Sequence, residues 1–284
     1  MLFRSYTQPQ YGTLGAWSSI GNSDYNAFTV SVRQRFKESL TLDFNYTMSK
    51  SFDDASGLMT SGVSSGTAFI LNPFRQSDNY ALSDFDVTHV VNANAVWQLP
   101  FGKGRLIGGK ANGVLDAIIG GWQLSSIVRA NSGLPTFSPY DDARWATNWN
   151  VQSSSVRTRP VTTCPTRGGA LFGCNTTQAF QSLRNPLPGE TGDRNVFRNI
   201  GTVNTDLGLG KSFKMPYNER HNLQLRWEVF NLFNYQAMGA FDTGRSGFGI
   251  PLDPQTKTPP VNWSRYTAIQ GSPRFMQIFL RYSF

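Results

Sequence analysis

The sequence has no hydrophobic run long enough to cross a bilayer as a helix. Its apolar stretches fall well short of the ~18 residues that a spanning helix needs, and its mean hydropathy is −0.33. It also has no lysine-rich run, although the net charge is +8. That positive surplus suits anionic lipid or lipopolysaccharide as well as nucleic acid, and the absence of a basic run argues against nucleic acid.

Cysteine is scarce, and only Cys164 and Cys174 occur, in a stretch rich in Pro, Gly and Thr. Two cysteines alone do not complete a zinc site. In an exported protein the pair predicts a small disulfide loop, and two unpaired thiols are the alternative. No metal or other cofactor is predicted. No nucleophile, base and acid can be grouped from the sequence, so we do not expect an enzyme.

The first 15 residues lack the apolar core and the small-residue cleavage site of a signal peptide. A protein of the bacterial outer membrane needs such a peptide for export. If the chain is an outer-membrane protein, we therefore expect it to be the later part of a longer polypeptide.

Aromatic residues are plentiful, at 13% of the chain, and they favour strands and membrane interfaces. Period-two alternation of apolar and polar residues predicts eight strands. The strong ones match the ~9–11 residues of a tilted spanning strand and exceed the ~5–6 of an average globular strand. The predicted strands cover residues 11–20, 26–36, 40–49, 87–99, 121–130, 202–213, 222–229 and 275–284.

The last strand shows the pattern most clearly. Every second residue counted back from Phe284 is apolar, and Tyr282 is the next of this set. A strand that ends the chain on an aromatic residue is typical of outer-membrane barrels, and Phe284 with Tyr282 resembles the signal read by the barrel assembly machinery. The fold predicted is an all-β antiparallel transmembrane barrel, or part of one.

The polar faces of these strands carry full charges. A small soluble barrel fills its interior with apolar side chains, whereas a membrane barrel has an apolar exterior and a wet lumen. We therefore predict a polar lumen wall that lines a substrate path. Its predicted members are Arg33, Asp43, Arg129, Arg226, Glu228 and Arg281.

Connection lengths alternate between long and short, as extracellular loops and periplasmic turns do. With the C-terminus in the periplasm, the long connections 51–86, 131–201 and 234–272 fall outside. The short connections fall inside, and so does a connection of intermediate length at 101–120. The one exception is the short connection 20–25, which falls on the outer side. The same parity puts His89 at the outer rim and His221 near the periplasm, so a shared metal site is not expected.

Aromatic and basic residues in the longest loop could bind substrate by stacking, or could pack that loop onto its neighbours. They are Tyr140, Arg144, Trp145 and Trp149. The pair Asp53 and Asp54 is more typical of a solvated loop than of a cation site.

Several segments together resemble one family. Residues 44–54 (FNYTMSKSFDD) are similar to a "YTWSKSIDD" segment of TonB-dependent receptors. Residues 82–89 (LSDFDVTH) and 97–104 (WQLPFGKG) resemble their "SDFDVRH" and "LPFGKG" segments. The order and spacing of these motifs resemble the receptors with a carboxypeptidase-regulatory-like domain that are common in Acidobacteria.

The resemblance implies a 22-stranded barrel, a plug, and a TonB box that couples to an energised inner-membrane complex. This chain resembles only the C-terminal barrel portion, so residues 1–284 are expected to form one part of a barrel without plug or TonB box. Expected partners are outer-membrane lipid, lipopolysaccharide, the barrel assembly machinery, TonB through an N-terminal part, and a substrate. Siderophore, oligosaccharide, peptide and cobalamin all stay open.

Two other hypotheses compete with a receptor segment. One is a self-contained eight-stranded outer-membrane protein with a structural or adhesive role, in which the first strand pairs with the last. The other is a secreted β-sandwich that binds carbohydrate and needs no detergent.

Overall fold

The computed structural model describes residues 19–37, 39–56, 75–136, 155–166, 169–184, 190–215, 218–239 and 258–284. Within these ranges no helix has both the length and the apolar character needed to span a bilayer. The predicted loop residues Tyr140, Arg144, Trp145 and Trp149 lie outside the described residues. Most of the predicted first strand, 11–20, does so as well.

One antiparallel sheet of eight strands organises the molecule. The short strand β3 (Ala81–Leu82) pairs with the end of β2, and the other strands pair in chain order. The long strands are β1 (Ser23–Phe36), β2 (Leu40–Asp53), β4 (His89–Gln98), β5 (Trp122–Asn131), β10 (Thr202–Met215), β11 (Asn218–Phe230) and β14 (Phe275–Ser283). Seven of the eight predicted strands are thereby confirmed.

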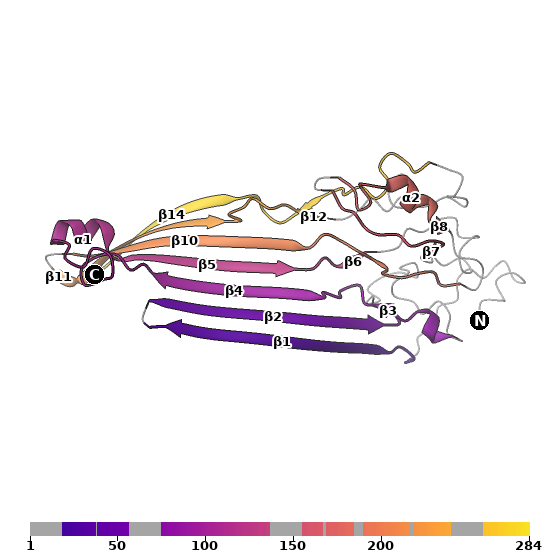
Figure 1. Cartoon of the computed structure of the whole chain (residues 1–284), viewed down its shortest axis with the longest axis horizontal. Coiled ribbons are helices and arrows are strands. Elements are labelled where there is room, and N and C mark those ends of the chain that lie inside the picture. The colour runs from indigo at the N-terminus through magenta and orange to yellow at the C-terminus, as the bar shows by residue number, and fades with distance from the viewer. Residues whose placement is uncertain are drawn as a thin grey trace, which may run out of the picture.

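The two ends of the sheet differ (Figure 1). At one end, which we call the turn end, the chain makes the close turn 37–39, the connection 99–121 and the step from β10 to β11. At the other, which we call the loop end, long connections join β2 to β4, β5 to β10 and β11 to β14. The predicted alternation of long and short connections is therefore confirmed.

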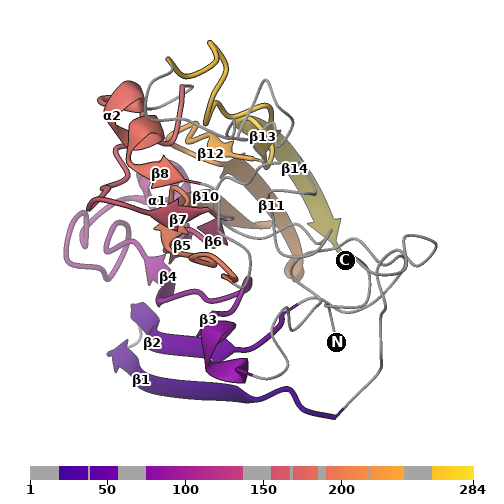
Figure 2. The same ribbon diagram turned by 90° about the vertical axis from the view of Figure 1, so that its right-hand side faces the viewer.

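Viewed from the loop end, the sheet bends into an open arc with β1 and β14 at its two edges (Figure 2). No pairing between β1 and β14 occurs. Both strands run toward the turn end, because strand directions alternate along the seven (Figure 1). Direct pairing of the two edges would consequently be parallel.

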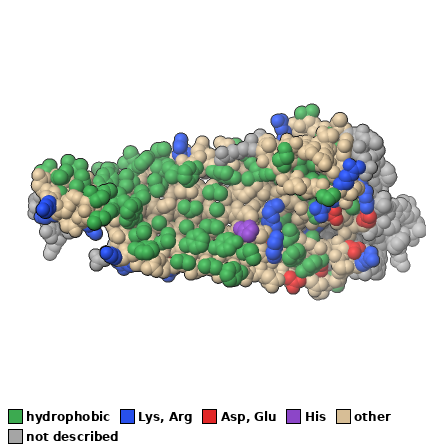
Figure 3. All heavy atoms as spheres, in the orientation of Figure 1, with side chains coloured by type: hydrophobic (Ala, Val, Ile, Leu, Met, Phe, Trp, Pro, Cys, Tyr) green, Lys and Arg blue, Asp and Glu red, His purple; other side chains and the backbone are tan. Residues whose placement is uncertain are grey.

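The convex face of the arc is apolar. Register places Phe44, Ala93 and Val128 side by side on it, and Trp227 lies beside Ile278. Hydrophobic side chains cover the strands on this face in the space-filling view, and acidic side chains appear only toward the loop end (Figure 3). Many of these apolar residues are exposed, including Phe28, Trp97 and Leu280. The convex face of the sheet is thus continuously apolar.

The buried hydrophobic cluster lies in the long connections and not on the sheet. It is centred on Phe172, Phe180 and Trp263, and we call the unit that it holds together the cap. Trp263 stacks on Phe172 and meets Phe180 edge-on, with ring centroids 5.3 Å apart in both pairs. Burial raises the pKa of Tyr266, beside this cluster, to about 12, so its phenol stays neutral at physiological pH.

Sequence periodicity did not predict the short elements, since they are too brief to show a pattern. In the connections at the loop end these are η1 (Gln76–Asp78), β6 (Pro135–Thr136), β7 (Val156–Arg157), α2 (Thr176–Gln181), β8 (Leu183–Arg184), β9 (Phe197–Arg198), β12 (Ala237–Met238) and β13 (Ile269–Gln270). At the turn end lies α1 (Gly113–Ile119).

Two adjacent residues near the middle of β5 test the assignment of the faces. Val128 is on the convex face beside Ala93, whereas Ile127 is on the concave face between Asn94 and Asp206. We expect Val128→Arg to destabilise the protein by about 2–4 kcal/mol, the cost of a cation near the bilayer midplane. Ile127→Arg should cost less than about 1 kcal/mol, because its guanidinium enters water beside Asp206.

Urea unfolding in phospholipid vesicles measures both variants. Equal costs at the two positions would contradict the assignment of one face to lipid and the other to water.

Candidate functional site

The concave face of the arc carries the polar side chains. Strand register places Arg33 opposite Asp43, and Asp43 opposite Asn94 on the next strand. Farther round the arc, Arg129 faces Asn92 and Asn204. The same register puts all six predicted wall residues on this one face: Arg33, Asp43, Arg129, Arg226, Glu228 and Arg281.

The six residues do not form a single cluster. Arg33 and Asp43 make an ion pair of 2.9 Å between β1 and β2. Arg226 and Glu228 make another, at 2.7 Å, on β11, and Gln277 of β14 donates to Glu228 at 2.7 Å. These pairs lie toward opposite edges of the arc. The six charged positions on this face are therefore separate from one another.

A glycine lies beside one of these cations on the concave face. Gly208 faces Glu228 across the β10–β11 pair, and a Cβ on it would lie 3.7 Å from a terminal guanidinium nitrogen of Arg226. It would also come within 2.5 Å of the Ser125 hydroxyl. The bare backbone at Gly208 thus makes room for the Ser125 hydroxyl, which donates to the Gly208 carbonyl at 3.3 Å, and the Arg226 guanidinium passes beside it at ordinary contact distance.

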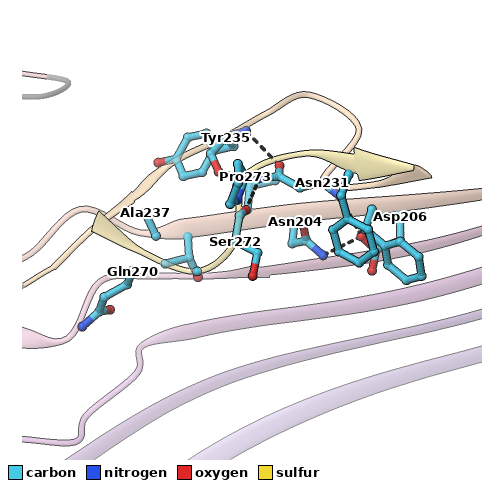
Figure 4. A pocket seen from close by; sticks show the side chains of 13 residues that line it. Asn204, Asp206, Asn231, Tyr235, Ala237, Gln270, Ser272 and Pro273 are labelled. Atoms are coloured by element: carbon cyan, nitrogen blue, oxygen red, sulfur yellow. Dashed lines mark hydrogen bonds between the residues drawn. The ribbon is translucent and has the colours of Figure 1, made fainter. Parts of the chain in front are cut away.

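A cavity of about 420 Å³ lies near the loop end of this face, among β10, β11 and the residues before β14 (Figure 4). Phe230 and Phe275 stack at one side of it, with ring centroids 4.5 Å apart and planes 12° from parallel. Asn204, Asp206 and Gln270 line it with polar groups. An aromatic surface beside amide and carboxylate groups suits a polar organic ligand that has one apolar face.

Hydrogen bonds fix the floor of this cavity. Asp206 accepts on Oδ1 from the Asn204 side chain and from the Asn231 backbone N–H, both at 2.9 Å. Within the described residues no group donates to its Oδ2, which leaves that oxygen for a ligand. Asn231, at φ 52°, holds the following turn through the Tyr235 N–H and the Tyr235 and Ser272 carbonyls. Asn231 is therefore a positioning residue, because asparagine tolerates this left-handed backbone.

The cavity residues were not among those predicted from the sequence. Asp206 lies on a polar strand face, but parity gives no sign that the turns after β11 and before β14 fold over it. Phe230 and Phe275 depart from the alternation, since aromatic residues there lie on the polar face. That departure is the one signal in the sequence for this site.

At the loop end, a group of buried and partly buried polar residues that we call the rim network ties β2 to two later segments. It comprises Ser51, Asp53, Asp54, Ser83, Asp86, Arg194, Asn195 and Arg198. The expectation that Asp53 and Asp54 lie in a solvated loop was wrong. They are only 4% and 3% exposed, because β2 continues to Asp53 and Arg194 pairs with it at 2.5 Å.

Asp86 is the most connected carboxylate of the rim network. It is 1% exposed, accepts from the Ser51 backbone N–H at 2.8 Å and pairs with Arg198 at 2.5 Å. Arg198 also donates to the backbone carbonyls of Asp86 and Gly133. Since Arg198 is in β9, these contacts fix the segment before β10 against the outer ends of β2 and β4.

Cys164 and Cys174 are joined by a disulfide. The bond closes a loop that contains Leu171 and Phe172 of the cap cluster. Among the described residues there is no group of three or more His, Cys, Asp or Glu side chains that could hold a metal ion.

The two histidines lie at opposite ends of the sheet, on its convex face. His89 begins β4 at the loop end and hydrogen-bonds through Nδ1 to the Tyr46 hydroxyl at 2.8 Å. His221, near the start of β11 at the turn end, hydrogen-bonds to the hydroxyl of Tyr282. Paired aromatic groups at both rims of an apolar belt are typical of the interfacial girdles of membrane barrels.

The family comparison agrees with this geometry. The family model of the outer membrane beta barrel domain matches residues 2–277. The chain belongs to this outer-membrane barrel family. No curated protein and no solved structure matches. For an outer-membrane barrel the convex apolar face is the lipid-facing side, and the wall residues and the cavity line the side away from lipid.

The rim network of this outer-membrane barrel allows a matched test. Asp86→Asn keeps the shape of the side chain but leaves Arg198 without its counter-charge. We expect the cap to lose about 2–4 kcal/mol of stability, because breaking a buried ion pair is costly. Partial solvation of Arg198 keeps this loss below that of a fully buried pair. Hydrogen exchange of residues 190–200 measures it.

Asp193→Asn is the control, because its pair with Arg157 is more than a third exposed on both sides and should contribute less than about 1 kcal/mol. Similar protection in the two variants would show that the rim network does not hold the cap.

Proposed function

We propose that this chain forms the C-terminal arc of a TonB-dependent receptor barrel, which captures a substrate at its loop end and passes it along a polar wall. The observation that carries the proposal is the direction of the edge strands. Since β1 and β14 run the same way, the seven long strands cannot close antiparallel on themselves. Single-chain bacterial barrels are antiparallel with an even number of strands.

The edges support the same conclusion energetically. All fourteen residues of β1 are exposed, and its outer edge has no partner strand among the described residues. In lipid each unpaired backbone N–H or C=O group costs several kcal/mol, so both edges need further strands. A larger barrel supplies them, as the motifs at 44–54, 82–89 and 97–104 suggest by their resemblance to TonB-dependent receptors.

The proposed roles follow from the position of each group. The cap and the cavity beside Phe230 and Asp206 contact the substrate first, and the wall residues Arg129 and Arg226 lie along its route. Tyr140, Arg144, Trp145 and Trp149 stay candidates for loop contacts. The long connections face the exterior and the C-terminus faces the periplasm. Lipopolysaccharide, the barrel assembly machinery and TonB, through an upstream part, are the proposed partners.

A self-contained eight-stranded outer-membrane protein is the competing proposal. It requires a strand at 11–20 that pairs with both β1 and β14, and this would restore antiparallel closure. A secreted sandwich is disfavoured, because no second sheet of the described residues packs on the apolar face.

Intact mass separates the two proposals. The polypeptide that carries these residues is extracted from native outer membranes in detergent and weighed. A receptor should give a mass far above the 31.6 kDa of this chain. A mass near 31.6 kDa would contradict the receptor proposal and favour the small barrel.

The cavity gives a direct functional prediction. Uptake of ferric siderophore, oligosaccharide, peptide and cobalamin is measured in cells with and without TonB, to find the TonB-dependent substrate. For that substrate, Phe230→Ala should lower affinity by about fivefold, near 1 kcal/mol for one aromatic contact.

Val32→Ala is the control, because that side chain lies opposite Phe44 on the convex face, away from the cap and the cavity. Unchanged affinity in Phe230→Ala would exclude this cavity from capture.

A further inference from the structure

The connection between β4 and β5, residues 99–121, folds into a compact unit that we call the turn-end unit. Its first half closes on itself, because the Ile107 N–H donates to the Pro100 carbonyl at 2.9 Å and the Gly104 N–H to that of Gly109 at 3.1 Å. Its second half is α1, which Asn112 caps by accepting from the Leu115 N–H at 2.8 Å. An ordered unit of this size exceeds what a simple strand-to-strand turn needs.

The end of α1 is fixed over the convex face of the sheet. Lys211 and Trp122 face each other across the β10–β5 pair on that face. The Lys211 ammonium donates to the carbonyls of Ile118 and Gly120, and the Trp122 indole donates to Ile118 at 3.0 Å. A cation on the last carbonyls of a helix is a favourable cap. The turn-end unit therefore lies on the lipid side of the arc and not under its lumen.

The outward surface of this unit is apolar. Leu106 is 87% exposed, Val114 75% and Ile118 63%, and Ile107 and Leu115 of the same unit are exposed as well. In water such a cluster would be unfavourable, at about 25 cal/mol per Å² of apolar surface. This apolar surface continues the apolar convex face of the strands, and the contacts of Lys211 and Trp122 connect the two.

The same unit is basic. Lys103, Arg105 and Lys110 are exposed, and Asp116 is the only acidic residue between 99 and 121. Its Oδ1 already accepts from the Lys103 backbone N–H. An apolar surface bordered by cations is the pattern of interfacial segments that bind anionic lipid.

We propose that the turn-end unit is a membrane anchor that inserts Leu106, Val114 and Ile118 into the adjacent bilayer leaflet and binds anionic phospholipid headgroups through Lys103, Arg105 and Lys110. Under the proposed orientation this is the periplasmic leaflet. The anchor would hold the turn end of the barrel at a fixed depth, against the pull exerted on it during energised transport.

A pair of spin-label positions tests the insertion. Nitroxides are attached at Ile118→Cys and at Gly113→Cys, where a side chain would meet no atom within 4 Å and which lies on the other side of α1. The outer-membrane protein is reconstituted in vesicles of phosphatidylglycerol and phosphatidylcholine. Circular dichroism and heat-modifiable gel migration first confirm that both variants are folded.

The anchor predicts that the Ile118 label collides at least several times more often with oxygen than with a water-soluble nickel chelate, and that the Gly113 label shows the reverse. Two labels that are equally accessible to the chelate would overturn the proposal. A label at Ile118 that is shielded from both reagents would mean that protein covers the unit, which would also overturn it.

The charges have a separate test. Lys103→Gln, Arg105→Gln and Lys110→Gln are combined, and spin-labelled phosphatidylglycerol and phosphatidylcholine are compared as boundary lipids. The native protein should prefer phosphatidylglycerol severalfold, since each cation near the surface contributes about fivefold, and the triple variant should lose most of that preference.

No preference in the native protein, or an unchanged preference in the triple variant, would overturn the headgroup site. Neither test measures uptake, so failure of the anchor and failure of the receptor proposal are distinguishable.

Discussion

The whole structure depends on one constraint, which is that the described residues leave most of one apolar face of the sheet uncovered. The strands satisfy their backbone groups by pairing, but their outward side chains, such as Phe28, Trp97 and Leu280, stay exposed. The buried cluster lies elsewhere, in the cap around Trp263. Only lipid supplies the missing apolar surroundings, and lipid in turn forbids unpaired edges. The polar concave face and the need for further strands follow from that constraint.

The sheet and the connections at the loop end position different groups of polar residues. Wall residues such as Arg226 are set by strand register and are spread over several strands of the concave face. The cavity beside Phe230 is built instead by turns that fold over strand ends and are held by Asn231, whereas the rim network around Asp86 holds the segment before β10. Buried ion pairs thus order the connections at the loop end, whereas strand register alone orders the wall.

Sequence periodicity predicted the strands well, because a side-chain period of two is imposed by the pleat and by one-sided burial. The side on which each wall residue lies followed from the same rule. It could not predict α1, whose seven residues show no period, or the burial of Asp53, which depends on an arginine 141 positions away. Long-range polar pairing of this kind leaves no local pattern. Phe230 visibly breaks the alternation of apolar and polar residues along β11. This exception could not be interpreted from the sequence, because the neighbouring turns that form the cavity around it could not be predicted.

The most direct test of the account is a nitroxide scan along β11 from Leu223 to Phe230 in native outer membranes. Lipid outside and water inside predict oxygen accessibility that alternates with period two, with maxima at Leu225 and Trp227 and minima at Gln224 and Arg226. A flat profile, or one with maxima at Arg226 and Glu228, would contradict the assignment of the faces and with it the barrel wall proposed here.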